Sequence, residues 1–241
     1  MYWGRVKVHE FGGFSTSGMK ADISEGKYSG WDDQRLPTIA ALRRRGFSPE
    51  ALRAFWIELG LNQKDISVSM TTIESHNSKV IEKITPRVSF IGANNALLTL
   101  DLKKEWNSEI LKLPKHPDDS EMGYRNWPSP KKGDIIILEK GDIDEEIRLK
   151  EFANATVKGT KISANEFERT DRRQIVHWLL ENHTMPAILS TSNGDEIVEN
   201  KGLIETGKYQ VGDIFQLERM GFARITEISV NSEIKLVFLH E

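Results

Sequence analysis

The chain has 241 residues, of which 38% are hydrophobic and 29% are charged, with a formal net charge of −3. This size predicts one or two domains that are stable without disulfides or structural metals. The absence of cysteine excludes thiol nucleophiles and cysteine-bound zinc, and it is typical of the reducing cytoplasm. There is no apolar run of ~18 residues and no signal-peptide pattern, so we expect a cytoplasmic protein with no membrane partner.

Charge is distributed unevenly along the chain. Residues 1–133 carry 20 Lys and Arg against 16 Asp and Glu, whereas residues 134–241 carry 13 against 20. The field of the whole molecule therefore does not attract phosphates. A nucleic-acid partner would have to bind a local basic patch.

Helical periodicity begins near residue 32. A first helix, capped by Asp32 or Asp33, is expected to end at Gly46. Ser48 followed by Pro49 is the pattern of an N-cap with proline at the first helical position, and it predicts the start of a second helix.

The second helix is expected to end at Gly60 and to carry Trp56 on its apolar stripe. Thr71 and Glu74 have the spacing of a capping box and predict a third helix, and Pro86 ends the helical pattern. Residues 32–85 are therefore predicted to form a compact unit of three or more helices.

After Pro86 the pattern changes to short β runs separated by Gly, Asn, Asp and Pro. The predicted strands are Arg87–Ile91, Leu97–Leu102, Asp134–Glu139, Ala155–Ile162, Gln174–Leu180, Pro186–Leu189, Asp213–Glu218, Ala223–Val230 and Ile234–Leu239. Nine strands at this spacing predict barrels or sandwiches. The proline-rich segment 114–132 is expected to pack across a surface, and Trp178 and His177 are expected in the core.

Common catalytic motifs are absent, because the chain has no G-x-S-x-G, no P-loop and no G-x-G-x-x-G. We also expect no metal site. Two other stretches contain residues that could contact phosphates. The segment Gly12–Lys20 is either a loop that folds over phosphates or a polar surface loop. The run Arg43-Arg44-Arg45 either complements a helix C-terminus or contacts RNA phosphates.

The order of these stretches resembles the order of motifs in the class I glutamyl- and glutaminyl-tRNA synthetases. Phe14-Ser15-Thr16-Ser17 stands where that family has the Met-Ser-Lys-Ser of its "KMSKS" loop. Gly30-Trp31-Asp32-Asp33 and then Leu42-Arg43-Arg44-Arg45-Gly46 follow, as at the start of the family's stem-contact domain. Further matches are Thr85-Pro86-Arg87, Lys115-His116-Pro117-Asp118, Glu121-Met122-Gly123-Tyr124-Arg125, Ile147-Arg148-Leu149-Lys150, Val176-His177-Trp178 and Phe215-Gln216-Leu217-Glu218-Arg219-Met220-Gly221-Phe222.

The Ser-Thr-Ser loop and the ending Phe222-Ala223-Arg224-Ile225 are similar to the archaeal-type glutamyl enzymes, whose anticodon-binding region consists of β-barrels. Glutaminyl enzymes share these barrels and are the alternative specificity. The resemblance implies an α+β fold in which a small helical stem-contact domain is followed by two β-barrels. The implied boundaries are 1–29 for the end of the catalytic domain, 30–85 for the stem-contact domain and 86–241 for the barrels, with about 86–140 and 211–241 proximal and about 141–210 distal.

The resemblance also implies catalytic residues. Ser15, Thr16, Ser17 and Lys20 would belong to the loop that closes on ATP and Mg²⁺ in the full enzyme. Thr16 stands where a lysine usually neutralises the transition-state charge, and Lys20 is the nearest amine. A cation at such a centre contributes several kcal/mol. We therefore expect Lys20 to assist ATP.

The implied tRNA contacts lie further along the chain. Arg87, Arg148 and Lys150 are candidates for contacts to anticodon bases, which proteins read by stacking and by hydrogen bonds to base edges. The alternatives are that Arg87 pairs with a carboxylate and that Arg148 and Lys150 join a surface ion-pair cluster with Asp144-Glu145-Glu146. Arg43, Arg44 and Arg45 are candidates for phosphate contacts.

The implied function is the C-terminal tRNA-binding portion of a glutamate–tRNA ligase, with tRNA(Glu) as partner and no DNA. The full enzyme would use glutamate and ATP with Mg²⁺ and form glutamyl-adenylate. The family's Rossmann domain with its "HIGH" motif would precede residue 1, so this portion alone is expected neither to activate glutamate nor to hold a cofactor tightly. The alternative from another class is a stand-alone, non-catalytic tRNA-binding barrel protein.

Overall fold

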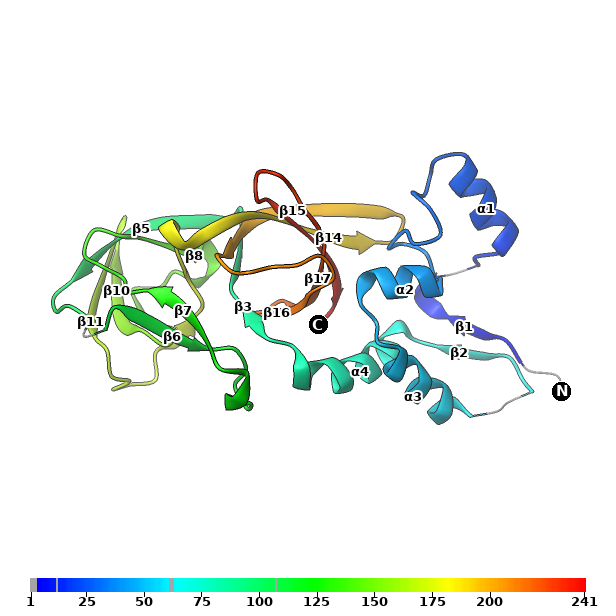
Figure 1. Ribbon diagram of the computed structural model, residues 1–241, viewed down its shortest axis with the longest axis horizontal. Helices are drawn as coiled ribbons and strands as arrows, with labels where there is room; N and C mark the ends of the chain where they lie inside the picture. Colours follow the sequence, from blue (N-terminus) through cyan, green and yellow to red (C-terminus); the bar gives the residue numbers. More distant parts are fainter. Residues whose placement is uncertain (1–3, 12, 61–62, 107) are drawn as a thin grey trace.

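The computed structural model describes residues 4–11, 13–60, 63–106 and 108–241. Figure 1 shows an elongated molecule with the helices gathered near the N-terminus. The strands form two large sheets. The sheet beside the helices is called the proximal sheet, and the sheet at the far end is called the distal sheet.

The N-terminal part combines short strands and helices. In chain order these are β1 (Val6–Val8), η1 (His9–Phe11), α1 (Thr16–Ser24), α2 (Ile39–Arg45), α3 (Pro49–Leu59), β2 (Ile66–Val68), α4 (Met70–Ile81) and η2 (Glu82–Ile84). Strands β1 and β2 pair in parallel. Phe55 and Ile73 pack with Leu42, Phe47 and Met70 in a small core, so α2, α3 and α4 form one packed unit.

Helix α3 begins as predicted. Ser48 is its N-cap, and the Ser48 hydroxyl accepts a hydrogen bond from the backbone N–H of Ala51 at 3.1 Å. Helix α2 differs from the prediction because Thr38, not Asp32 or Asp33, is its N-cap. Pro37 precedes this cap. Because the residue before a proline avoids helical geometry, the helix begins only after Pro37. Gly46 ends α2 with φ of 110°, as expected.

Helix α4 and the loop before α1 also differ from the predictions. Ser69, not Thr71, caps α4, and the predicted partner Glu74 instead pairs with Arg45. The expected loop Gly12–Lys20 is helical from Thr16 onward, while Gly12 itself lies outside the described residues. Trp56 is 51% exposed, because Phe55 occupies the core face of α3.

Two seven-stranded sheets follow the helices. The distal sheet has the order β12 (Gln174–Val176), β9 (Glu146–Leu149), β10 (Ala153–Lys158), β11 (Lys161–Glu166), β5 (Asn95–Leu102), β8 (Ile135–Glu139) and β13 (Leu179–Leu180). The proximal sheet has the order β3 (Arg87–Val88), β16 (Ile214–Leu217), β17 (Gly221–Ile228), β18 (Ile234–His240), β14 (Thr184–Asn193), β15 (Glu196–Glu205) and β4 (Phe90–Gly92). Both sheets are barrel-like, which confirms the predicted α+β fold with β-barrels.

The strands are divided between the sheets differently from the expected proximal and distal ranges. The strands of the distal sheet all come from residues 95–180, and those of the proximal sheet come from residues 87–92 and 184–240. Parallel pairing of β11 with β5 and of β14 with β18 joins segments that are far apart in sequence. Strand patterns show where strands lie but not which strands pair, so the expected division was wrong.

Three segments also differ from the strand predictions. The segment predicted as one strand, 155–162, belongs to the hairpin β10–β11, which turns at Gly159 with φ of 59°. The proline-rich segment 114–132, for which no strand was predicted, contributes to the hairpin of β6 (Ile110–Pro114) and β7 (Tyr124–Pro128). Strand β15 lacked an apolar pattern because most of its residues are exposed.

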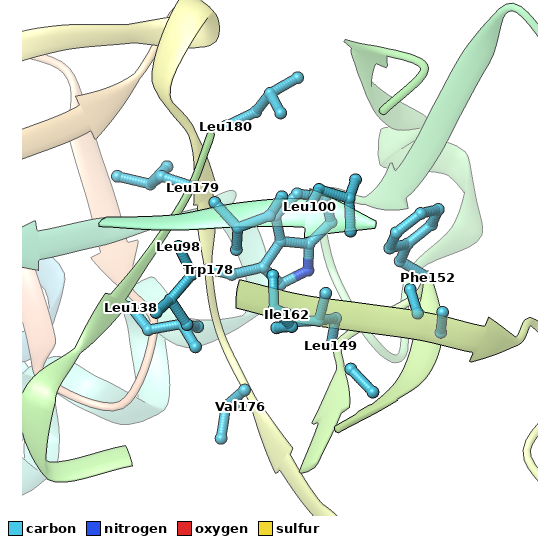
Figure 2. Packing of buried hydrophobic residues seen from close by; sticks show 14 of the residues in the cluster. Leu98, Leu100, Leu138, Leu149, Phe152, Ile162, Val176, Trp178, Leu179 and Leu180 are labelled. Atoms are coloured by element: carbon cyan, nitrogen blue, oxygen red, sulfur yellow. The ribbon is translucent and has the colours of Figure 1, made fainter. Parts of the chain in front are cut away.

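Trp178 lies in the middle of the distal core, as predicted (Figure 2). Its ring centroid is 5.1 Å from that of Trp127 and 5.5 Å from that of Phe152. His177 is also buried, and its Nε2 lies 3.2 Å from the carbonyl oxygen of Phe90 in the proximal sheet. The aromatic packing therefore stabilises the distal core, and the contact between His177 and Phe90 links the two sheets.

Candidate functional site

A cavity of about 280 Å³ lies between the proximal and distal sheets. It is lined by Arg87, Lys150, Ile175, His177, Gln216, Glu218 and Arg219. Three of these side chains are cationic, one is a carboxylate and one is an amide. The cavity therefore presents both hydrogen-bond donors and acceptors, beside the apolar side chain of Ile175.

Strand pairing places Arg87 at this cavity. Strands β3 and β16 are parallel, and their register sets Arg87 beside Gln216. The Arg87 Nε donates a hydrogen bond to Oε1 of Gln216 at 2.9 Å. The expected alternative was a carboxylate partner, but within the described residues the guanidinium pairs with this amide. Arginine has five N–H donors, so donors remain for a ligand.

Lys150 reaches the cavity from the turn after β9. Its Nζ lies 3.0 Å from Oε1 of Glu218, which follows β16 in the other sheet. Burial favours the neutral acid, but the charges of Arg125 and Lys150 outweigh it and hold the pKa of Glu218 below its usual value. The Lys150 side chain is 25% exposed, so its ammonium is at the surface of the cavity.

Arg148 does not line this cavity, although it was predicted with Lys150. Its Nη1 donates to Oδ1 of Asn154 at 2.8 Å, and its Nη2 donates to the carbonyl oxygen of Phe167 at 3.0 Å. Arg148 therefore holds the segment after β11 against the distal sheet. Within the described residues, Arg148 also does not form the alternative ion-pair cluster with residues 144–146.

The arginine run at the end of α2 separates into two exposed members and one that is partly buried. Arg43 is exposed, and Arg44 forms a surface ion pair with Asp32 at 3.2 Å. The side chain of Arg45 is 13% exposed, pairs with Glu74 at 3.5 Å and donates to the carbonyl oxygen of Leu239. Arg45 therefore joins α2 to α4 and β18, whereas Arg43 is the member whose side chain is directed to solvent.

The hydroxyl residues of the expected "KMSKS"-like loop lie at the start of α1. Ser15 is the N-cap, and its Oγ accepts a hydrogen bond from the backbone N–H of Gly18 at 3.0 Å. A cavity of about 260 Å³ beside it is lined by Ser15 and Gly18, but Thr16, Ser17 and Lys20 are not part of that lining. Those three side chains are exposed on the surface of α1.

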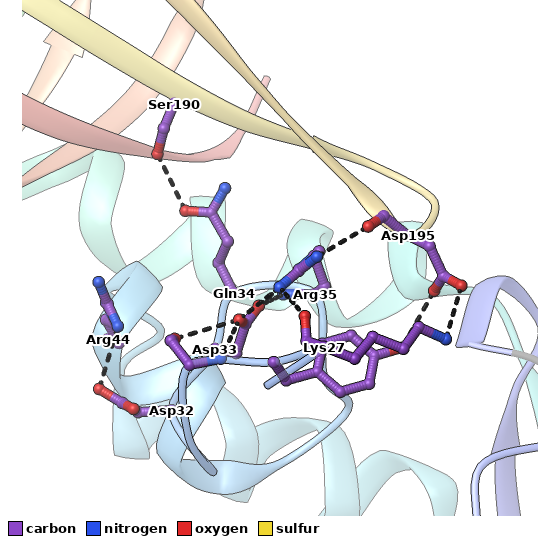
Figure 3. Close-up of polar contacts among 10 residues, drawn as sticks. Lys27, Asp32, Asp33, Gln34, Arg35, Arg44, Ser190 and Asp195 are labelled. Atoms are coloured by element: carbon purple, nitrogen blue, oxygen red, sulfur yellow. Dashed lines mark hydrogen bonds and ion pairs between the residues drawn. The ribbon is translucent and has the colours of Figure 1, made fainter. Parts of the chain in front are cut away.

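The Gly-Trp-Asp-Asp segment forms a polar cluster that the sequence did not predict (Figure 3). The Asp33 carboxylate is buried and accepts hydrogen bonds from the Ser29 hydroxyl at 3.1 Å and from Arg35 Nη2 at 2.8 Å. Burial raises the pKa of Asp33, but the hydrogen bonds and the Arg35 charge outweigh this effect and hold the pKa well below its usual value. Arg35 in turn lies over the Tyr28 ring, 4.8 Å from its centroid.

This cluster joins the helical unit to the tip of the hairpin β14–β15. Asp195 at the tip forms an ion pair with Lys27 at 3.0 Å and accepts a hydrogen bond from the Tyr28 hydroxyl at 3.1 Å. Arg35 Nη1 donates to the carbonyl oxygen of Asp195 at 2.9 Å. Figure 3 shows that the contact extends along the hairpin, where Ser190 donates to Oε1 of Gln34.

A second missed cluster is built around Arg125 in β7. Its guanidinium contacts Glu205 and Glu218, both buried. A signal for its burial exists in the sequence, because side chains two apart on a strand share a face. Trp127 is a core residue, and Arg125 lies on the same face of β7.

Within the ranges that the structure describes, no group of three or more His, Asp or Glu side chains has the arrangement of a metal site. Among the same residues, every helix is too short or too polar to cross a bilayer.

Comparisons with known proteins fit this arrangement. Residues 13–83 match the model of the catalytic domain of class I tRNA synthetases (E and Q), and residues 85–173 match the model of their anti-codon binding domain. The curated "Glutamate--tRNA ligase" of Methanosarcina acetivorans is 34% identical over 251 residues, which cover 100% of this chain and 42% of the relative. The chain belongs to the class I tRNA synthetases of the E and Q family.

Two further relatives of this family have the same extent of similarity. The glutamate–tRNA ligase of Methanosarcina barkeri is 37% identical, covering 99% of this chain, and that of Archaeoglobus fulgidus is 36% identical, covering 99%. The synthetase chain spans 42% of the length of each. The resemblance read from the sequence is therefore confirmed.

The two matches meet where the structure of this synthetase chain changes. The catalytic-domain match ends at residue 83, within η2, and the anticodon-domain match begins at residue 85, just before β3. The helical unit and α1 therefore belong to the first match. Arg87 and Lys150 at the cavity between the sheets lie within the second match, whereas its other lining residues lie beyond residue 173.

Proposed function

We propose that this chain is the C-terminal, tRNA-binding portion of a glutamate–tRNA ligase. Support comes from archaeal relatives named glutamate–tRNA ligase that align along the whole chain. The whole enzyme would attach glutamate to tRNA(Glu), using ATP with Mg²⁺ and forming glutamyl-adenylate. This portion would contact the inner stem of the tRNA and read its anticodon.

The observation that carries the proposal is the cavity between the two sheets. Arg87 and Lys150 offer donors, Gln216 and Glu218 offer acceptors, and Ile175 offers an apolar contact. Proteins recognise a splayed-out base by hydrogen bonds to its edges and by stacking on aromatic rings or guanidinium planes, and the guanidinium groups of Arg87 and Arg219 lie at this cavity. The cavity thus has the chemistry to hold a single unstacked anticodon base.

The remaining tRNA would lie along the helical unit. Residues 30–85 would form the stem-contact domain, with Arg43 and Arg44 exposed at the end of α2. Exposed arginines bind phosphates without reading sequence. Residues 86–241 would then take the anticodon loop, and Arg148 would hold the segment after β11 against the distal sheet.

The start of α1 would act on ATP in the complete enzyme. Ser15, Thr16 and Ser17 place hydroxyls and backbone N–H groups at a helix N-terminus, where anions are stabilised. Lys20 is exposed on the same helix and would add the positive charge that Thr16 does not supply. These residues would close over the phosphates.

The test is binding of RNA hairpins to the 241-residue chain. Glutamate anticodons have the form UUC or CUC, and glutamine anticodons UUG or CUG, so hairpins that carry CUC and CUG differ in one base. We expect tighter binding of the CUC hairpin. Arg87→Ala should remove about 1–3 kcal/mol of discrimination at one position. Arg53→Ala, on the exposed face of α3, is the matched control.

Each other outcome has a definite meaning. A preference for the CUG hairpin would assign the chain to glutamine. Equal binding of both hairpins and of hairpins with other triplets would refute the proposal that the barrels read an anticodon. A uniform loss with Arg87→Ala across all triplets would make Arg87 a phosphate contact.

A further inference from the structure

Arg125 joins two glutamates inside the molecule. Its side chain is 6% exposed, Nη1 donates to Oε2 of Glu205 at 2.6 Å and Nη2 donates to Oε1 of Glu218 at 2.6 Å. Glu205 is the last residue of β15, and Glu218 follows β16. One guanidinium in the hairpin β6–β7 therefore compensates two buried carboxylates of the proximal sheet.

This cluster is continuous with the cavity between the sheets. Oε1 of Glu218 also accepts a hydrogen bond from Lys150 Nζ at 3.0 Å. Glu218 and Lys150 line the cavity, whereas Arg125 and Glu205 are not in its lining. Two cations thus face two carboxylates, and only the outer pair is available to a ligand.

Arg125 determines whether the Lys150 ammonium has to compensate the buried carboxylates. The backbone N–H of Ser89 donates to Oε2 of Glu205 at 2.9 Å, but it is neutral and does not compensate the charge. Without Arg125, two buried carboxylates would have Lys150 as their remaining cation. A buried, uncompensated carboxylate is costly, and lysine has a flexible stem, so its ammonium would move inward.

We propose that Arg125 is a positioning residue for anticodon recognition: by compensating Glu205 and Glu218, it leaves the Lys150 N–H donors that do not bond Glu218 available to a base in the cavity. This inference rests on the proposed function, in which the cavity takes an anticodon base. Arg125 itself does not touch RNA. Its effect is therefore on discrimination between bases and not on attraction of the phosphates.

Four variants of the 241-residue chain test the charge argument. Arg125→Met should reduce the preference for the CUC hairpin over single-base variants about tenfold at one anticodon position, the size of one lost edge contact. Arg125→Lys retains a cation, and Arg125→Met with Glu205→Gln restores the charge balance, so both should keep the preference within about twofold. Arg45→Met, which replaces a partly buried, ion-paired arginine at the helical end, should also keep the preference.

The salt dependence of binding separates this role from a structural one. The slope of log K against log[salt] reports the number of neutralised phosphates. We expect the same slope for Arg125→Met as for the wild type, because the exposed arginines are unchanged. A protein with a disrupted barrel would lose affinity for all hairpins and change its slope.

The failures of the two proposals are distinguishable. If the wild type shows no preference among hairpins, the proposed function fails. If the wild type discriminates and Arg125→Met discriminates equally well, the role of Arg125 is refuted. If Arg125→Met does not fold, the charge-balanced variant Arg125→Met with Glu205→Gln is measured instead. A loss of more than fivefold in its preference for the CUC hairpin would show that charge balance alone does not position Lys150.

Discussion

Replacing Asp33 with asparagine tests the polar cluster that holds the helical unit to the β14–β15 hairpin. Asparagine keeps the shape of the side chain and removes the charge that Arg35 faces at 2.8 Å. Removing one partner of a buried ion pair costs about 3–5 kcal/mol. Arg35 is 15% exposed and keeps its hydrogen bonds to the carbonyl oxygens of Lys27 and Asp195, so we expect the lower end, about 3 kcal/mol.

The loss of stability caused by Asp33→Asn should depend on pH in a defined way. The pKa of Asp33 is lowered in the folded state, so its stabilisation is complete above the pKa of the unfolded chain, about 3.9, and is lost as pH falls towards the folded pKa. The difference in unfolding free energy between wild type and Asp33→Asn should be constant from pH 7 to about 5 and shrink below about 4.

Urea unfolding followed by circular dichroism at several pH values measures this difference. Asp32→Asn is the matched control, because Asp32 is the exposed neighbour in the same segment and should cost less than about 1 kcal/mol. A difference below about 1 kcal/mol for Asp33→Asn at pH 7, or one that does not narrow on acidification, would refute the argument.

Three further predictions concern separate parts of the chain. Trp178→Ala should destabilise the distal sheet by about 3–5 kcal/mol, because it removes a fully buried ring, and thermal unfolding would show this against Trp56→Ala, whose ring is 51% exposed. Arg43→Ala should weaken binding of full-length tRNA equally for all anticodons and reduce the salt slope by about 1; an unchanged slope would remove Arg43 from the interface. Lys20→Ala in the complete enzyme should slow glutamate-dependent pyrophosphate exchange, and an unchanged rate would exclude Lys20 from ATP activation.

Features set by neighbouring residues were predictable from the sequence. Ser48 and Pro49 begin α3 as expected because an N-cap contact spans three residues. The core position of Trp178 followed from an apolar strand pattern. The resemblance to synthetases likewise depended on motifs that are continuous in the sequence.

Features set by distant partners were not predictable. Asp33 had the sequence context of a helix cap, but its partner Arg35 is fixed in turn by Asp195, 160 residues away in sequence. Arg45 is held inside the helical end by Leu239 and Glu74, which belong to other elements. The hydrogen bonds of Arg148 were unpredictable for the same reason, because the residues after β11 fold back onto it.

The order of the strands makes the distal sheet an insertion in the proximal one. The chain leaves the proximal sheet after β4 at Gly92 and returns at β14 at Thr184, and both strands pair with β15. The proximal sheet therefore cannot close until the intervening segment has brought these two points together, and the entropy cost of closing a loop grows with its length. Prior folding of the distal sheet shortens that loop, so we expect distal amides to gain protection from hydrogen exchange before proximal ones during refolding.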